Sequence, residues 1–225
     1  MKKTTWALII PCAILVILAL TQSTYHRIVE KNFFELLENL NNSPSAHYKV
    51  TETHTSIQDG KTSTYTYAKE YWFHNDSIFS TWESDDEGKA YLKYGNQYFT
   101  KSLDPNAKWQ KNIQTSFGTC IWNSITPELL SACPMEIKKS GSYTDLIFTE
   151  DLGSMNCTFS RQVAEHTFRL NKNQELISYQ FIFTTYNSQK IDASAVHSVE
   201  KKLYGGFSYG QEVIAQIDQQ YALVK

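Results

Sequence analysis

The sequence has few of the residues that mark disordered or repetitive chains, and it lacks a surplus of either charge. Its 225 residues include only 9 glycines and 5 prolines, far below the content of collagen-like or low-complexity segments. Lysine and arginine together number 21, against 23 aspartates and glutamates. No basic excess of the kind found in nucleic-acid-binding domains is present. We therefore expect a globular protein that has no nucleic-acid partner.

The side chains that bind metals or perform catalysis are scattered along the chain. There is no H-E-x-x-H and no C-x-x-C, which are spacings typical of zinc sites. His47 and His54 stand seven positions apart, so in a strand they would face opposite ways. We predict no catalytic residue, no metal site and no cofactor, and we do not expect an enzyme. An enzyme would need a convergent cluster in an open cleft, such as His54 with Glu52 or His74 with Glu70.

One apolar segment dominates the N-terminus. Residues 4–25 carry no charge, and they follow Lys2-Lys3 and precede His26-Arg27. The most apolar part, Trp6–Leu20, would extend roughly 22 Å as a helix, while a bilayer core is about 30 Å thick. The polar ends bring the uncharged stretch closer to a full span. A cleaved signal peptide and a retained signal anchor both fit, and the two lysines would stay inside in either case.

This segment predicts the compartment and the domain division. We expect residues 1–25 to be a signal anchor or signal peptide and residues 26–225 to form a single exported β-rich domain. The domain would lie outside the cytosol at the cell membrane, or be secreted if the leader is cleaved. The N-terminal segment would then make the membrane one partner of the protein.

Cysteines are few, and three lie beyond the leader: Cys120, Cys133 and Cys157. In an oxidising compartment one pair can form a disulfide and leave one thiol free. We predict a Cys120–Cys133 disulfide, because that pair closes a short loop. The alternative is that all three are small buried apolar side chains.

The apolar pattern predicts one helix followed by many strands. Residues 27–41 place Val29, Phe33, Leu36 and Leu40 at helical spacing, and Pro44 ends this pattern. A second, short helix should begin at Thr126-Pro127, and a third should cover residues 211–221. Alternation with a period of two predicts strands at residues 48–57, 61–74, 78–84, 89–94, 97–103, 143–149, 154–160, 165–171, 177–184 and 191–203.

This order of elements resembles the lipoprotein-carrier half-barrels of the LolA/LolB-like superfamily. The matching features are the amphipathic helix Phe33–Leu40, the tyrosine-rich strand Lys61–His74, the hairpin Tyr91–Tyr98 and the segment Trp109–Lys111 that leads into a mid-chain crossing. The resemblance implies an α+β fold, in which helices cover a strongly curved antiparallel sheet and an apolar hollow holds acyl chains. Here an N-terminal membrane helix would precede that half-barrel.

Aromatic residues make up 14% of the chain, and most of them fall on predicted strands. They have two interpretations: plain core packing, or the lining of a cavity for an apolar ligand. Under the second interpretation the candidate ligand-binding residues are Tyr67, Tyr71, Phe73, Trp82, Tyr94, Phe99, Phe168, Phe181 and Phe183.

The predicted function is a non-catalytic binding domain of the cell envelope that holds a lipid or another apolar ligand. The alternative is an envelope protein–protein interaction module that binds no ligand and has another envelope protein as its partner. An exported enzyme is the third hypothesis.

Overall fold

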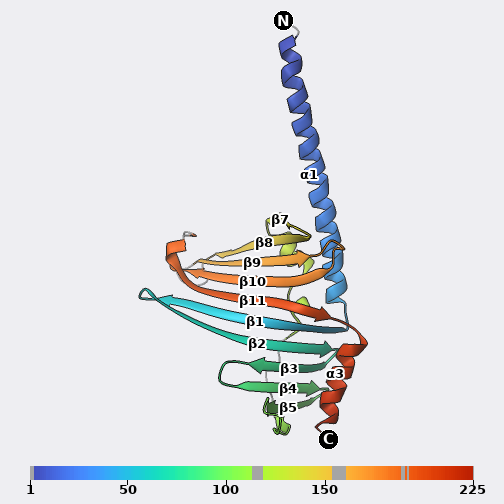
Figure 1. The fold of residues 1–225 in the computed structure, drawn as a ribbon, viewed down its shortest axis with the longest axis vertical. Helices are drawn as coiled ribbons and strands as arrows, with labels where there is room; N and C mark the ends of the chain where they lie inside the picture. Colours follow the sequence, from blue (N-terminus) through green and yellow to red (C-terminus); the bar gives the residue numbers. More distant parts are fainter. Residues whose placement is uncertain (1–2, 113–118, 154–160, 189–190, 192, 225) are drawn as a thin grey trace.

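The structure is a computed structural model that describes residues 3–112, 119–153, 161–188, 191 and 193–224. Its centre is one open antiparallel sheet of 11 strands. Helices pack against both faces of this sheet (Figure 1). The predicted α+β class with a large antiparallel sheet is therefore confirmed.

Each half of the chain supplies one run of strands. The first half contains α1 (Lys3–Asn41), β1 (Ser45–Gln58), β2 (Lys61–His74), β3 (Ser77–Glu83), β4 (Gly88–Tyr94), β5 (Gln97–Ser102) and β6 (Gln110–Asn112). The second half contains η1 (Ile121–Asn123), α2 (Pro127–Ser131), β7 (Met135–Ser140), β8 (Tyr143–Gly153), β9 (Arg161–Leu170), β10 (Leu176–Tyr186), η2 (Ala193–Ala195), β11 (Val196–Ser208) and α3 (Gln211–Ala222).

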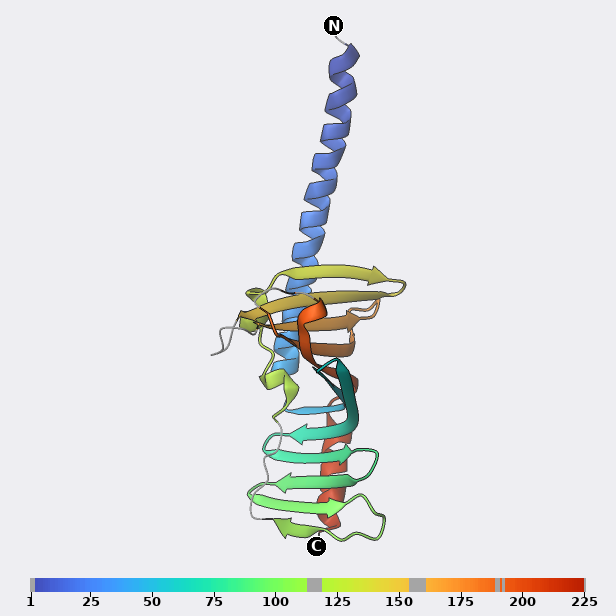
Figure 2. The same cartoon turned by 90° about the vertical axis from the view of Figure 1, so that its left-hand side faces the viewer.

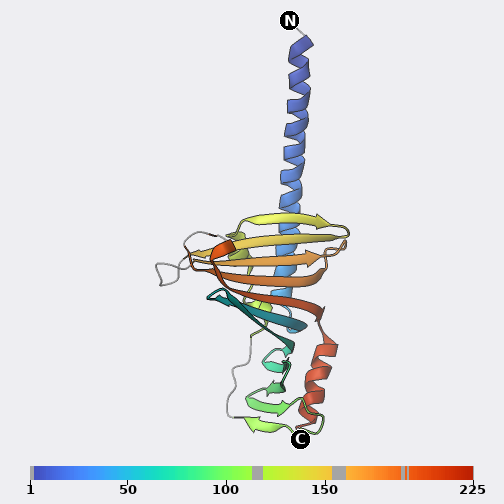
Figure 3. The same ribbon diagram turned by 60° about the vertical axis from the view of Figure 1, so that its left-hand side comes forward.

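The first and last strands of the chain join these two meanders into a single sheet. The strand order is β6-β5-β4-β3-β2-β1-β11-β10-β9-β8-β7, and β1 lies beside β11 in the middle of the sheet (Figure 3). In this pairing Val50 is opposite Tyr204, and Glu52 is opposite Lys202. The centre of the sheet is thus built from strands that lie far apart in the sequence.

Local turn chemistry sets the hairpins within each meander. Asp59 and Gly60 join β1 to β2 with φ angles of 52° and 72°, the left-handed pair that a two-residue hairpin turn requires. Gly95, with a φ of 57°, begins the turn between β4 and β5. At the start of α2 the Thr126 side chain accepts a hydrogen bond from the Leu129 amide, which is the predicted N-cap.

Alternation along the strands gives the sheet two different faces. In β2, Phe73 joins the apolar cluster that contains α1, and Trp72 points the other way and stacks on Phe79, with 4.7 Å between the ring centroids. We call the first surface the α1 face and the second the α3 face. Each face carries its own buried cluster.

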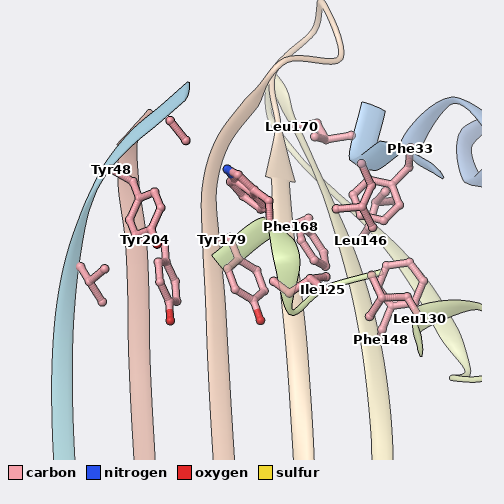
Figure 4. Packing of buried hydrophobic residues seen from close by; sticks show 14 of the residues in the cluster. Phe33, Tyr48, Ile125, Leu130, Leu146, Phe148, Phe168, Leu170, Tyr179 and Tyr204 are labelled. Atoms are coloured by element: carbon pink, nitrogen blue, oxygen red, sulfur yellow. The ribbon is translucent and has the colours of Figure 1, made fainter. Parts of the chain in front are cut away.

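On the α1 face, α1 and the mid-chain crossing fill part of the surface. Phe33 and Leu37 of α1 are almost completely buried, as are Trp122 of η1 and Leu130 of α2. Figure 4 shows Phe33 and Leu130 beside Phe148, Leu146 and Phe168, which project from the neighbouring strands. Figure 2 shows η1 and α2 beside the C-terminal part of α1.

The N-terminal part of α1 projects away from the sheet (Figures 1 and 2). The predicted helix of residues 27–41 and the leader belong to one continuous 39-residue helix. It ends at Asn41, close to the position that Pro44 predicted. Within the part of the chain that the structure describes, no helix is both long and apolar enough to cross a membrane, so the predicted membrane helix is not supported.

The last strand differs from its prediction at both ends. We predicted residues 191–203 with Gly205-Gly206 as a break, but β11 covers Val196–Ser208 and passes through both glycines. The register with β1 shifts between His47 and Lys49, and Gly206 has a φ of 64°. This left-handed residue lets the strand bulge and continue. The strand predicted at residues 154–160 lies outside the described residues.

The bulge predicts a specific sensitivity to substitution. A Cβ added at Gly206 would meet nothing closer than Lys49 Cγ at 3.8 Å, so the cost of Gly206→Ala comes from its left-handed backbone and should be about 1–2 kcal/mol. Gly205→Ala is the matched control, because Gly205 has no positive φ and its nearest contact would be 3.9 Å away. Urea unfolding of the two variants measures the difference, and equal stabilities would contradict the bulge.

Candidate functional site

Alternation divides the predicted ligand-binding aromatics between the two faces. Tyr94 and Phe99 lie on the α3 face, where Tyr94 stacks on Tyr221 with 3.9 Å between ring centroids and Phe99 packs near Val213. Tyr94 and Phe99 are therefore on the opposite face of the sheet from the other predicted ligand-binding residues. The α1 face carries Tyr67, Tyr71, Phe73, Trp82, Phe168, Phe181 and Phe183.

Three of the α1-face aromatics are part of the packed core. Phe168 is 0% exposed and Phe73 is 6% exposed. Tyr71 is partly buried and stacks on Phe73, with 5.6 Å between ring centroids. For these three residues the structure supports the core-packing interpretation.

The other four aromatics lie farther along the strands, toward the tip of the β1–β2 hairpin, and all are partly exposed: Tyr67, Trp82, Phe181 and Phe183. Tyr65, next to them on β2, is 58% exposed. Neither buried cluster of the described residues contains Tyr65, Tyr67 or Trp82. The aromatic surface therefore continues beyond the part that α1 and Trp122 fill.

Charged side chains lie in the middle of this aromatic surface. Glu52 of β1 is only 7% exposed, and Lys69 Nζ lies 3.0 Å from its Oε2 atom. Across the β1–β11 pairing, Glu52 faces Lys202, whose Nζ is 2.7 Å from Glu200 Oε1. Two lysines and two glutamates thus alternate over three neighbouring strands.

A histidine and a tyrosine extend this network. His54 Nε2 lies 2.8 Å from Tyr67 Oη and 3.9 Å from Glu52 Oε2. Burial, reinforced by Glu52, raises the pKa of the Tyr67 phenol. The same two causes raise the pKa of Tyr71 to about 12. Both phenols keep their protons at neutral pH and can donate hydrogen bonds.

We call this combined surface the outer region. It consists of Glu52, His54, Tyr65, Tyr67, Lys69, Trp82, Phe181, Phe183, Glu200 and Lys202. A pocket of about 220 Å³ opens at its edge and is lined by His54, Tyr65, Phe183, Glu200, Thr55, Ser56, Ser198 and Val199.

Sequence reasoning considered Glu52 only as a possible enzyme residue beside His54, and it missed the charged network that Glu52 forms with Lys69, Glu200 and Lys202. The sequence did indicate it, because Glu52 lies two and four positions after the buried Val50 and Tyr48 and therefore shares their face of β1. Lys69 likewise interrupts the run of aromatic residues on one face of β2. Charges at inward-facing positions of a strand are exceptions to the usual pattern, and such exceptions concentrate at functional sites.

A second, larger pocket of about 500 Å³ lies where α1 meets the first meander. Its lining combines apolar side chains such as Leu40, Phe73 and Ile78 with polar ones such as Asp76 and Lys93. It contains none of the residues of the outer region.

Of the two carboxylate–histidine pairs considered for an enzyme, the structure brings one together and separates the other. Glu52 and His54 do come together, but the Glu52 carboxylate is buried and its closer contact is with Lys69 Nζ at 3.0 Å. Glu70 and His74 do not pair, because Glu70 bonds to His47 at 2.8 Å and His74 bonds to Asn75. Among the described residues, no three metal-ligating side chains are grouped.

One serine motif lies on the α3 face. Residues 206–210 read G-F-S-Y-G, which matches the G-x-S-x-G spacing of hydrolase nucleophiles. Ser208 Oγ is 3.0 Å from His47 Nδ1, and the other ring nitrogen contacts Glu70. However, Ser208 ends β11 two residues after the bulge and does not itself have the positive φ of a strained nucleophile turn, and the Gly210 amide is bonded to Ser45 Oγ. We interpret the three side chains as a cross-strand hydrogen-bond chain.

The predicted disulfide is absent from the structure. Cys120 and Cys133 are both free thiols, and each packs against the core of the α1 face. Cys133 Sγ contacts the Leu129 carbonyl oxygen at 3.5 Å, and burial raises the pKa of both thiols. The two side chains therefore match the alternative of small, partly buried apolar groups. Cys157 lies outside the described residues.

Comparison with known proteins gives matches of structure only. No protein-family model matches the chain, and no curated protein does. A DUF1329 family protein from Desulfovibrio piger matches with a TM-score of 0.31 and 11% identity, over 86% of this chain and 97% of that one. An outer membrane lipoprotein-sorting protein domain from Vibrio parahaemolyticus matches with a TM-score of 0.32 and 7% identity, over 85% and 96%.

A LolA superfamily protein from Nitrosomonas europaea also matches, with a TM-score of 0.29 and 9% identity, over 79% of this chain and 93% of that one. One of the matched structures is thus a LolA superfamily protein, the superfamily that the sequence pattern resembles. At these TM-scores nothing follows from it about what this chain binds.

His166 of β9 lies between the packed core and the outer region. It is 5% exposed, its Nδ1 atom is 2.8 Å from Tyr179 Oη, and its Nε2 atom has no hydrogen-bond partner among the described residues. Burial lowers its pKa to about 4. The folded protein therefore holds this imidazole in its neutral form at neutral pH.

This buried histidine predicts a loss of stability in acid. Because the folded-state pKa lies below the unfolded value, the unfolded chain takes up the proton first, and stability falls as the pH drops from about 6.5 toward 4. The loss attributable to His166 should reach about 2 kcal/mol at pH 5. Urea unfolding at pH 7.5 and pH 5 should show a smaller loss for His166→Gln than for the wild type. The exposed control His197→Gln should keep the wild-type dependence.

The serine motif predicts an absence of reactivity. Fluorophosphonate probes label serines whose hydroxyl is activated by a neighbouring base, and we expect labelling of the full chain to be no greater than that of Ser208→Ala. Labelling that disappears in both Ser208→Ala and His47→Gln would contradict this and favour the enzyme hypothesis.

Proposed function

We propose that this chain is a non-catalytic, extracytoplasmic binding domain that holds an amphipathic or apolar ligand against the outer region. The observation that carries the proposal is the uncovered aromatic surface of Tyr65, Tyr67, Trp82 and Phe183, which lies beside a filled core. Aromatic side chains gathered at an open surface are typical of sites that take up apolar partners.

The filled part of the α1 face limits where a ligand could lie. Phe33, Leu37 and Trp122 occupy the space beside β8 to β10, so an acyl chain cannot use it without displacing them. The outer region is not filled in this way, and it offers ring surfaces on both sides of a polar centre. The uncharged leader that follows Lys2-Lys3 supports export of the domain.

A protein partner remains the second candidate, but the sheet edges do not favour strand addition. The edge strand β7 presents Glu136, Lys138 and Lys139 as exposed charges, and within the described residues the opposite edge strand β6 is three residues long. Charged or very short edge strands discourage pairing with another chain. A partner protein would therefore have to bind a surface other than the sheet edges, and the outer region is one such surface.

The binding proposal predicts which face a substitution must change. The variant Phe183→Arg places a charge among the rings of the outer region, and Leu203→Arg places the same charge on the α3 face, where Leu203 is 43% exposed. Titration of the full chain with Nile red, an uncharged fluorescent dye, should show binding that Phe183→Arg weakens about tenfold or more. Leu203→Arg should bind as tightly as the wild type.

Two results would contradict the proposal. One is a wild-type chain that neither binds the dye nor carries any extractable lipid or other apolar molecule by mass spectrometry. The other is equal weakening by Phe183→Arg and Leu203→Arg, which would mean that the dye binds elsewhere or that a general effect of charge is being measured.

A further inference from the structure

At the buried position of Glu52, an apolar side chain could pack equally well. Glu52 follows Tyr48 and Val50 on the same face of β1, and both of these are 2% exposed. Burying a carboxylate costs several kcal/mol, and replacing a buried ion pair with apolar side chains is often neutral or stabilising. The presence of Glu52 and Lys69 at the centre of the sheet therefore calls for an explanation other than stability.

The cluster around Glu52 is balanced in charge. Lys69 and Lys202 lie on the strands to either side of Glu52, and Glu200 pairs with Lys202. These four formal charges sum to zero. Each ammonium group has three N–H donors, and the contacts among the described residues occupy one carboxylate partner for each. The cluster can thus offer hydrogen bonds without offering a net charge.

Aromatic rings border the cluster on both sides. Trp82 of β3 lies opposite Lys69, and Phe181 and Phe183 of β10 lie opposite Lys202 and Glu200. Tyr67 lies beneath Lys69, whose Nζ is 4.8 Å from the ring centroid. This arrangement has a polar centre and apolar flanks, and it is complementary to a molecule with one polar head and one or more apolar chains.

We infer that the cluster of Glu52, Lys69, Glu200 and Lys202, with His54 and Tyr67, recognises the head group of an amphiphile, and that this head group hydrogen-bonds but carries no net charge. The inference rests on the proposed function and specifies its ligand. A head group with a net charge would leave that charge unbalanced in a partly desolvated site. An uncharged or zwitterionic head group exchanges its bonds with water for bonds to the cluster and leaves the balance intact.

The test is competition against Nile red on the full chain by amphiphiles of equal acyl length, each below its micelle concentration. The probes are a monoacylglycerol, a zwitterionic lysophosphatidylcholine, an anionic fatty acid and a cationic alkyl trimethylammonium. We expect the monoacylglycerol and the lysophosphatidylcholine to compete about tenfold better than either charged probe, a difference that a single unbalanced charge can supply.

Charge variants give the decisive comparison. Glu52→Gln leaves the cluster with a net positive charge and should shift the preference toward the fatty acid by about tenfold, whereas Lys69→Met should shift it toward the cationic probe. The double variant Glu52→Gln/Lys69→Met is neutral again and should restore the wild-type order. Because the readout is a ratio between head groups, a general loss of affinity or stability does not produce it.

Matched controls carry the same charge changes on β7, at a distance from the outer region. Glu136 and Lys138 form an exposed pair there, and Glu136→Gln and Lys138→Met should keep the wild-type order of probes. A wild type that binds the dye but ranks all four probes equally, with no response to Glu52→Gln, would overturn the head-group inference and leave the proposed function standing. Failure to bind the dye at all would overturn both.

Discussion

The pairing of β1 with β11 is the constraint on which the rest of the structure depends. These are the first and last strands of the chain, and their register sets Val50 opposite Tyr204 and Glu52 opposite Lys202. Without this pairing the chain would form two separate meanders instead of one sheet. Contacts so distant in sequence carry a large loop-closure cost, which the buried cluster of the α1 face offsets.

Uneven coverage of that face separates a packed core from a candidate site. Phe33, Leu37 and Trp122 fill the part of the sheet where the strands carry mainly apolar and aromatic side chains. Farther along the same strands the inward positions become charged or remain aromatic, and the exposed fraction of the side chains rises. One alternating pattern along β1, β2 and β11 therefore serves both stability and the proposed binding surface.

Features governed by neighbouring residues could be predicted from the sequence. The Asp59-Gly60 hairpin turn, the Thr126 cap and the terminal helix all appear in the structure close to their predicted positions. Features that depend on distant contacts could not be predicted. Gly206 looked like the end of a strand because nothing near it in the sequence reveals the bulge opposite β1. Cys120 and Cys133 were predicted to form a disulfide because they are close in the sequence. Sequence spacing does not show whether two side chains come within bonding distance in the fold, and both thiols are free.

The sequence by itself determined that the chain folds as a helix followed by two runs of antiparallel strands, because helical and strand periods and turn residues act over short distances. It also determined which side chains share a face within a regular strand such as β2. Only the tertiary structure decided which faces meet. It separated Tyr94 and Phe99 from the other aromatics and placed Glu52 beside both Lys69 and Lys202. The reason is that strand order and register follow from the total apolar surface that is buried across the whole sheet. The sequence of one short segment does not determine that total.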